Sequence, residues 1–162
     1  MKLRCEMADE LHPNVSAFLD MIAWSEGTDN GRQRTKDRGY DVIVGGSTFT
    51  GYADHPRALV TLGKLGVKST AAGRYQLLSR YFDAYKKSLK LPDFSPRSQD
   101  LIALQQIRER KALALIEAGK LATAMIAVSN IWASLPGAGY GQHEHKVFDL
   151  VAQYQRAGGS VA

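Results

Sequence analysis

The stretch "NVSAFLDMIAWSEGT", residues 14–28, decides how the rest of the chain is interpreted. Its apolar residues recur at helical spacing and share one face: Val15, Phe18, Leu19 and Ile22. We expect a buried helix with Asn14 as its N-cap and Gly27 as its stop. An acidic residue directly before that stop is poorly placed as an anion, so its position calls for a physical explanation.

Glu26 continues the apolar face of this helix, because it follows Ile22 by one helical turn. Burial and the negative end of the helix dipole both disfavour the charged form, so both should raise the pKa of Glu26. A carboxylic acid that keeps its proton near neutral pH can act as a general acid. The structural alternative is that Glu26 pairs with Arg32 or Arg74 and does no chemistry.

Short β-prone runs follow this helix, and helical patterns follow them. The segment "YDVIVGGSTFTGY", residues 40–52, predicts a hairpin around Gly45–Gly46, and Ala58–Leu62 predicts a further strand. Helical patterns are expected over residues 72–89, 97–119, 120–132 and 144–159, the last with Val147, Leu150, Val151 and Tyr154 turned inward. The expected class is α+β, with a small antiparallel β-lobe and a larger helical lobe flanking a groove.

The length of 162 residues suits one domain, predicted over residues 14–159 after a flexible tail of residues 1–13. The single cysteine, Cys5, excludes an internal disulfide framework. The first residues lack the pattern of a secretory signal, and no apolar run reaches the roughly 20 residues of a membrane span. We therefore expect synthesis in the cytoplasm and no stable membrane association. The formal net charge of +5 indicates attraction to a polyanion.

Glycoside hydrolysis usually needs a second carboxylate beside the acid, either as nucleophile or as water-activating base. Asp29, Asp41 and Asp54 are the candidates in the loop and β-prone region. Asp41 alternates with Tyr40 and Val42, so it shares a face with Ile43 and is expected to face the groove. Asp29 lies in the loop after the helix, where a solvated turn residue is the commoner explanation, and Asp54 is a weaker candidate than Asp41.

Aromatic and amide side chains suggest sugar contacts in two other segments. In "AAGRYQ", residues 71–76, Tyr75 and Gln76 are expected at a helix start, where glutamine can bond to hydroxyls and amides. In "SLPGAGYGQ", residues 134–142, and just before it, Tyr140 and Trp132 could stack on a sugar. For Tyr75, packing in the core is the alternative.

Several other functions are disfavoured. The "HEH" run, His143 to His145, lacks the spacing of a zinc site, and neither a metal nor an organic cofactor is expected. The glycine-rich stretch lacks the lysine and the preceding strand of a phosphate loop. The basic run of Arg32, Arg34, Lys36 and Arg38 is most often a solvated loop, although it could help to hold an anionic polymer.

Long strings in the chain resemble the lambda-type phage endolysins: "FLDMIAWSEGTDNGRQ", "GYDVIVGG", "GRYQLLSR" and "NIWASLPGAGYGQ". The resemblance covers about Phe18 to Gly159 and implies a lysozyme-like fold. It implies a lytic transglycosylase that cleaves the β-1,4 bond between N-acetylmuramic acid and N-acetylglucosamine and leaves a 1,6-anhydromuramic end. By the match to "WSEGT", Glu26 is the implied catalytic residue. Tyr75, Gln76, Asn130 and Tyr140 are implied to lie near the sugars.

This chemistry explains why no second carboxylate is obligatory, since the sugar's own C6 hydroxyl replaces water as the nucleophile. The place of the aspartate of hydrolytic phage lysozymes is taken by Thr35. The chain departs from the family pattern at Arg38, where histidine is expected, in the "LGKLGVK" loop, and in its longer N-terminal tail. These departures affect substrate affinity and leave the acid in place.

The resemblance also implies a place of action. The expected partner is the glycan strand of peptidoglycan, without nucleic acid, and the protein is expected to be a monomer. It would leave the host cytoplasm through holin-type lesions and reach the periplasm and wall. Two alternatives stay open: a hydrolytic muramidase that uses Glu26 with Asp41 or Asp29, and a basic module that binds wall or nucleic acid without catalysis.

Overall fold

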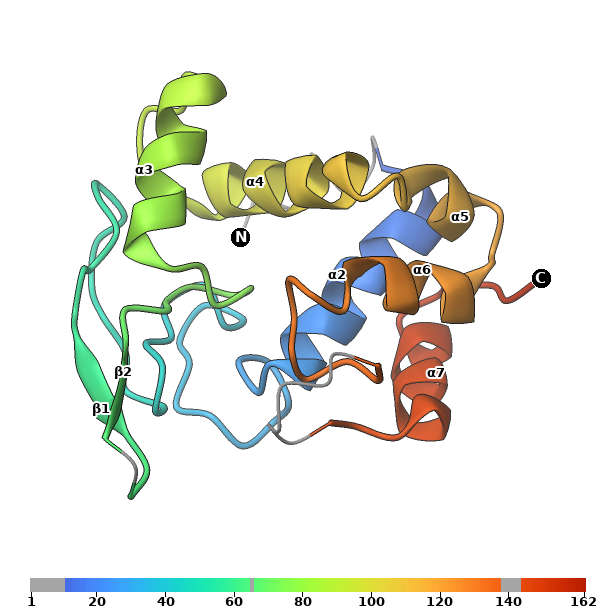
Figure 1. Ribbon diagram of the computed structural model, residues 1–162, viewed down its shortest axis with the longest axis horizontal. Helices are drawn as coiled ribbons and strands as arrows, with labels where there is room; N and C mark the ends of the chain where they lie inside the picture. Colours follow the sequence, from blue (N-terminus) through green and yellow to red (C-terminus); the bar gives the residue numbers. More distant parts are fainter. Residues whose placement is uncertain (1–10, 65, 138–143) are drawn as a thin grey trace. The chain divides into compact units, whose positions relative to one another are not determined.

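The computed structural model describes residues 11–64, 66–137 and 144–162. The order of elements is α2 (Pro13–Ser25), β1 (Val60–Leu62), β2 (Val67–Ser69), α3 (Ser79–Ser88), α4 (Pro96–Glu109), α5 (Leu113–Glu117), α6 (Leu121–Val128) and α7 (Val147–Arg156) (Figure 1). In the part of the chain that the structure describes, α2 precedes the small sheet and the other helices follow it. The predicted α+β class is confirmed.

The chain divides into two compact units. Unit 1 comprises Met1–Glu26 and Ala103–Ala162, and unit 2 comprises Gly27–Ile102, so the boundary falls at the end of α2 and again inside α4. The single domain over residues 14–159 stays a prediction. Most of the predicted tail, residues 1–10, lies outside the described residues.

The start of α2 differs from the prediction. His12 is the N-cap, and its ring Nδ1 accepts a hydrogen bond from the backbone N of Asn14 at 3.1 Å. Pro13 occupies the first turn, where its missing N–H costs nothing. Asn14 lies inside the helix, where its side chain donates to the carbonyls of Ile116 and Glu117, each at 3.2 Å. Its Oδ1 accepts from Ser160 N at 2.9 Å. Asn14 therefore joins three segments of unit 1 and does not cap its own helix.

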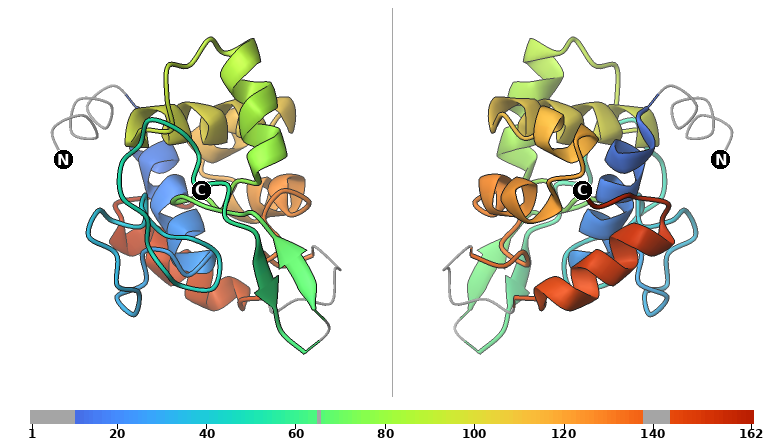
Figure 2. Two further views of the ribbon diagram at one scale, coloured as in Figure 1. Left: turned by 90° about the vertical axis from the view of Figure 1, so that its left-hand side faces the viewer. Right: turned by 90° about the vertical axis from the view of Figure 1, so that its right-hand side faces the viewer.

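The middle of α2 is buried on almost every side. The predicted face of Val15, Phe18, Leu19 and Ile22 is confirmed as core, each side chain being at most 1% exposed. Other positions around the helix are equally buried, among them Ala17, Met21 and Ala23. Within unit 1, α2 packs against α5 and α7, and α5 packs against α6 (Figure 2). Gly27, at φ +76°, ends the helix as predicted.

The later helices of unit 1 are shorter than predicted. The segment 97–119 forms two helices, α4 and α5, with Lys111 at φ +55° in the break between them. A left-handed residue cannot continue an α-helix, so the periodic pattern is interrupted there. The pattern over 120–132 is helical only in α6. In α7, Leu150 and Tyr154 are fully buried as predicted, whereas Val147 is 45% exposed because the helix only begins there.

The sheet of unit 2 consists of β1 and β2 in antiparallel register, with Thr61 opposite Lys68. The predicted strand at Ala58–Leu62 is therefore confirmed from Val60 onward. The hairpin predicted at Gly45–Gly46 is a tight turn closed by a single bridge between Val42 and Thr48. It does not lengthen into strands because neighbouring backbone groups bond elsewhere. The N–H of Val44 donates to Ala71 O at 2.9 Å.

Helix α3 begins later than predicted. Residues 72–77 form a tight turn closed by a bridge between Ala72 and Leu77, and Gln76 has φ +53°. The helix itself starts at Ser79. Tyr75 and Gln76 thus lie in a turn before the helix, which changes the directions in which their side chains point.

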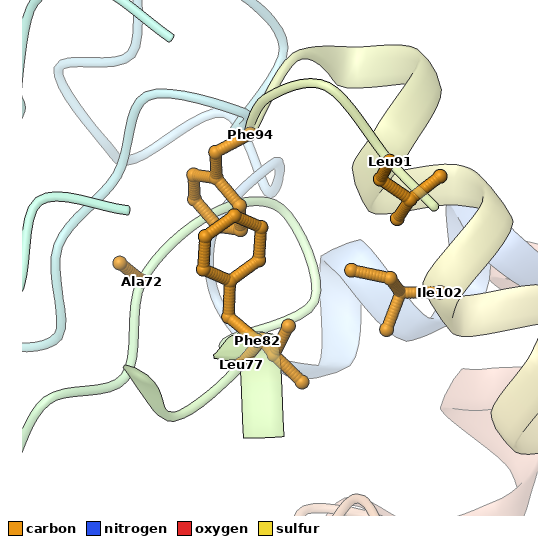
Figure 3. Packing of buried hydrophobic residues seen from close by; sticks show 6 residues of the cluster. All are labelled: Ala72, Leu77, Phe82, Leu91, Phe94 and Ile102. Carbon is orange, nitrogen blue, oxygen red and sulfur yellow. The ribbon is translucent and has the colours of Figure 1, made fainter. Parts of the chain in front are cut away.

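The apolar core of unit 2 lies where this turn, α3 and the start of α4 meet. Its buried residues are Ala72, Leu77, Phe82, Leu91, Phe94 and Ile102 (Figure 3). The rings of Phe82 and Phe94 meet edge to face with centroids 5.0 Å apart. Each fully buried phenylalanine contributes roughly 1.5–3 kcal/mol relative to an exposed one. This cluster fixes the turn that carries Tyr75 and Gln76.

Candidate active site

Glu26 is the C-cap residue of α2, and its backbone N–H donates to Ile22 O at 2.8 Å. The side chain is partly buried. Burial raises the pKa of Glu26 from 4.5 to about 7, and a hydrogen bond with the Ser134 side chain opposes the rise. At neutral pH the carboxyl is therefore close to half protonated. This is the protonation behaviour that was predicted for a general acid.

The pKa shift of Glu26 does not come from an ion pair. Among the described residues, the groups that shift it are the buried surroundings and Ser134, and neither Arg32 nor Arg74 is one of them. Arg74 is almost fully buried and pairs with Asp29, with Nη1 and Oδ2 2.7 Å apart. The structural alternative for Glu26 as the partner of an arginine is thus not supported.

Ser134 connects Glu26 to two other parts of unit 1. Its hydroxyl accepts a hydrogen bond from the hydroxyl of Ser25 at 2.7 Å. Its carbonyl accepts from the backbone N of His145 at 3.0 Å. The His145 ring in turn lies with Nε2 3.0 Å from Ser25 O, and its centroid lies 4.7 Å from that of Trp24. Segments 24–26, 134 and 145 are therefore held together around the acid.

Sequence reasoning missed Ser25 and Ser134. No periodic or motif signal marks Ser134 as a partner of Glu26, because the two lie more than one hundred residues apart in the chain, and Ser25, which is next to Glu26, bonds to Ser134. His145 was considered only as part of a zinc site, for which the spacing is wrong. The one available signal was the resemblance string "NIWASLPGAGYGQ", which contains Ser134.

The Asp41 carboxylate is occupied within its own loop. Its Oδ1 accepts from the Thr35 hydroxyl at 2.5 Å, and its Oδ2 accepts from Lys36 N at 3.0 Å. The side chain is 6% exposed. Asp41 therefore holds the loop in shape, and the expectation that it faces a substrate is not supported by these contacts.

The other two candidate carboxylates are engaged as well. Asp29 is bound to Arg74, as described above. Asp54 pairs with Arg57, whose Nε lies 2.8 Å from Asp54 Oδ2, and this hydrogen bond lowers the pKa of Asp54. Each of these two carboxylates is thus bonded to an arginine.

Tyr75 belongs to the buried polar core of unit 2, so its alternative as a core residue is supported. It is 5% exposed, and its hydroxyl donates to Asp100 Oδ1 at 2.6 Å. The hydroxyl of Tyr40 donates to the same carboxylate at 2.9 Å. Gln76 is only partly buried, and its Nε2 donates to Gly73 O at 3.0 Å.

The remaining predicted sugar contacts differ in exposure. Trp132 is 2% exposed, so neither face of its indole is open for stacking and the prediction for it is wrong. Asn130 is exposed directly after α6. Tyr140 lies outside the described residues. Glu26, Asn130 and Trp132 belong to unit 1, whereas Asp41, Tyr75 and Gln76 belong to unit 2.

Within residues 11–64, 66–137 and 144–162, no group of three or more His, Cys, Asp or Glu side chains could hold a metal ion. None of the helices in the same described residues has the length and apolar character needed to cross a bilayer.

Comparison with known proteins now gives the family. The family described as Endolysin matches residues 16–161. The endolysin of Escherichia phage lambda is 64% identical over 152 residues, which cover 94% of this chain and 96% of that protein. This chain belongs to the endolysin family. The endolysin of Escherichia phage P2 is 54% identical over 157 residues, which cover 91% of this chain and 94% of that protein.

Solved structures agree with this family assignment. Bacteriophage lambda lysozyme complexed with a chitohexasaccharide matches with a TM-score of 0.92 and 63% identity, covering 94% of this chain and 98% of that one. Lysozyme from bacteriophage lambda matches with a TM-score of 0.88 and 62% identity, covering 94% of this chain and 98% of that one. The resemblance and the lysozyme-like fold expected from the sequence are confirmed. As a lysozyme-like endolysin, the protein is an enzyme of cell lysis that acts on peptidoglycan.

Proposed function

We propose that this endolysin is a lytic transglycosylase that cleaves the bond between N-acetylmuramic acid and N-acetylglucosamine in peptidoglycan. The observation that carries the proposal is the pKa of Glu26, which burial raises to about 7. An acid with that pKa can donate its proton and take one back at neutral pH. The substrate class is supported by the related lambda lysozyme structure, which holds a chitohexasaccharide.

In the proposed reaction, protonated Glu26 gives its proton to the glycosidic oxygen, and the bond from that oxygen to C1 of the muramoyl sugar breaks. The carboxylate of Glu26 then takes the proton of the C6 hydroxyl of the same sugar. The C6 oxygen forms a bond to C1 and gives the 1,6-anhydro product. Water is not consumed, and Glu26 ends the cycle protonated as it began.

The hydrolytic alternative is less well supported. A muramidase would need Asp41 or Asp29 to act as a nucleophile or to activate water. Asp41 accepts two hydrogen bonds from Thr35 and Lys36, and Asp29 is bound to Arg74. Neither carboxylate is free of protein partners. The lyase reaction needs only Glu26.

We propose that the sugars contact partly or fully exposed polar groups. Gln76 and Asn130 meet this condition, and Tyr140 remains a candidate from the family resemblance. Trp132 and Tyr75 do not meet it because both are core residues. Action as a monomer without a cofactor, and passage to the wall through holin-type lesions, complete the proposal.

Product analysis tests the reaction type. Purified sacculi are digested to completion, and the muropeptides are separated and weighed by mass spectrometry. A transglycosylase leaves anhydro ends that are one water lighter than reducing ends. Reducing ends alone would overturn the proposal in favour of hydrolysis.

A further inference from the structure

A row of basic side chains lies on the loop that follows α2 in unit 2. It consists of every second residue of the loop: Arg32, Arg34, Lys36 and Arg38. All are exposed, whereas the three residues between them are partly buried. We call these side chains the basic row. All four cations thus belong to the exposed part of the loop, whereas the residues between them are turned partly inward.

The residues between the cations anchor the loop from within. The Thr35 hydroxyl donates to Asp41 and accepts from the backbone N of Gly39 at 2.7 Å and of Asp37 at 3.2 Å. The hydroxyl of Tyr52 donates to Asp37 Oδ2 at 2.5 Å. Hydrogen bonds thus fix the side chains of Thr35 and Asp37 and the backbone N–H groups of Asp37 and Gly39.

The two ends of the basic row are fixed as well. At the first end, the backbone N of Arg32 donates to Asn30 Oδ1 at 2.9 Å. At the second, the buried guanidinium of Arg74 donates to the carbonyl of Arg38. Fixing the backbone that carries the cations before a ligand arrives lowers the entropy that the loop loses on binding. The loop therefore has the rigidity that a binding surface needs.

Two acids of this loop, Asp37 and Asp41, are held by hydrogen bonds from uncharged groups. Asp37 and Asp41 are turned inward as hydrogen-bond acceptors. No ion pair within the described chain joins Arg32, Arg34 or Lys36 to an acidic side chain. Clustered charges of one sign attract a polymer of the opposite sign.

A contrast within unit 2 supports this interpretation. Arg57 is also exposed, but it bonds to two carboxylates, those of Asp54 at 2.8 Å and Asp83 at 2.6 Å. Its positive charge is thus matched by neighbours in the protein. In the basic row, by contrast, the neighbouring acids Asp37 and Asp41 accept hydrogen bonds from Tyr52, Thr35 and the backbone N of Lys36.

We propose that the basic row binds the carboxylates of the peptide stems that peptidoglycan carries along its glycan strands. The proposal rests on the proposed function, because it concerns the same substrate. Guanidinium groups bind carboxylates through paired hydrogen bonds, and three of the four members are arginines. The basic row would attract the anionic part of the wall polymer, whereas Glu26 acts on the sugars.

The test compares two triple variants with the same loss of charge. The first carries Arg32→Gln, Arg34→Gln and Lys36→Gln, and the second carries Lys87→Gln, Arg110→Gln and Lys120→Gln at exposed sites elsewhere. The Glu26→Gln change raises the net charge from +5 to +6, and each triple variant lowers it by three, to +3. Both are made in the full chain with Glu26→Gln, so that the wall is not digested during the measurement.

Binding is measured to intact sacculi and to glycan strands from which an amidase has removed the stems, at about 0.05 M and about 0.3 M salt. On sacculi at low salt, the first variant should bind about tenfold more weakly than the Glu26→Gln parent, and the second within about twofold of it. The difference should shrink at high salt and be absent on stripped strands.

Three results would overturn the proposal. Equal losses in both triple variants would mean that only net charge matters. An equal loss on stripped strands would exclude the stem carboxylates. A loss of duplex DNA binding with unchanged binding to sacculi would assign the basic row to nucleic acid.

A variant that preserves the charges distinguishes the loss of positive charge from a disturbed fold of the loop. Arg32→Lys with Arg34→Lys should keep binding within about threefold, because the charges remain although the paired geometry is lost. Failure of the proposed function would be recognised separately. Digestion of sacculi by the Glu26→Gln parent would remove Glu26 from the reaction, and reducing ends alone among the wild-type products would replace the lyase by a hydrolase.

Discussion

Two carboxyl groups of this endolysin, Glu26 and Asp41, have opposite surroundings. Asp41 accepts hydrogen bonds on both oxygens from a hydroxyl and a backbone N–H of its own loop. Glu26 lies at the carbonyl end of a helix, where burial raises its pKa to about 7 and the Ser134 side chain opposes that rise. Donors stabilise an anion, whereas burial without enough donors favours the protonated acid. The difference teaches that the donors around a carboxyl decide whether it holds structure or moves protons.

Replacing Glu26 gives the largest expected effect. Glu26→Gln keeps the size of the side chain but cannot donate or accept the proton, so wall lysis should fall by about 10²–10⁴-fold. Clearing of a sacculus suspension measures the rate, and circular dichroism checks the fold. Lysis within tenfold of the wild type would remove Glu26 from the reaction and end its contrast with Asp41.

The same variant should change how stability depends on pH. Because the folded pKa of Glu26 is raised from 4.5 to about 7, the native state holds a proton that the unfolded state has released in this window. The free energy of unfolding of the wild type should therefore fall as pH rises from about 4.5 to about 7, by at most about 3 kcal/mol.

In Glu26→Gln this contribution is absent. Urea denaturation at several pH values measures the free energy of unfolding of both proteins. The value for the variant should rise relative to that of the wild type between about pH 4.5 and about pH 7, and the difference should stay constant above that range. Below pH 4.5 the two should differ little, since Glu26 is then protonated in both states. A difference that does not vary with pH would contradict the raised pKa.

Asp41→Asn should affect stability more than chemistry. The amide keeps one acceptor oxygen, but its NH₂ group then lies opposite a donor, either the Thr35 hydroxyl or the backbone N–H of Lys36. We therefore expect a loss of about 1–3 kcal/mol in the free energy of unfolding. The lysis rate of the folded fraction should stay within about tenfold of the wild type. A loss comparable to that of Glu26→Gln would instead make Asp41 a catalytic partner and support the hydrolytic alternative.

Ser134→Ala gives the smallest expected effect and sharpens the comparison. Its hydroxyl lowers the pKa of Glu26, so removing it should raise that pKa further. The basic limb of the pH profile of lysis should move to higher pH by less than about one unit. Ser129→Ala is the matched control, because the Ser129 hydroxyl donates to Ile126 O within unit 1. An unmoved profile in Ser134→Ala would show that Ser134 does not tune the acid.

Helices and strands were predictable where the local pattern is strong. The helix that carries Glu26, the strand at Val60 and the buried residues of α7 follow from periodicity, which is a property of neighbouring residues. The errors lie where distant partners override local preference. Asn14 bonds to segments more than one hundred residues away and does not cap its helix. Residues 72–77 form a turn although their spacing continues that of α3.

The candidate site divides in the same way. The sequence by itself determined that an acid ends the first helix next to apolar residues, and the physics of burial predicted its raised pKa from that position alone. Tertiary structure alone decided that Ser134 and not an arginine meets Glu26, that Asp41 anchors a loop, and that Trp132 and Tyr75 are core residues. The physical reason is that helical periodicity acts over neighbouring residues, whereas hydrogen-bond partners and exposure depend on which distant segments the folded chain brings together.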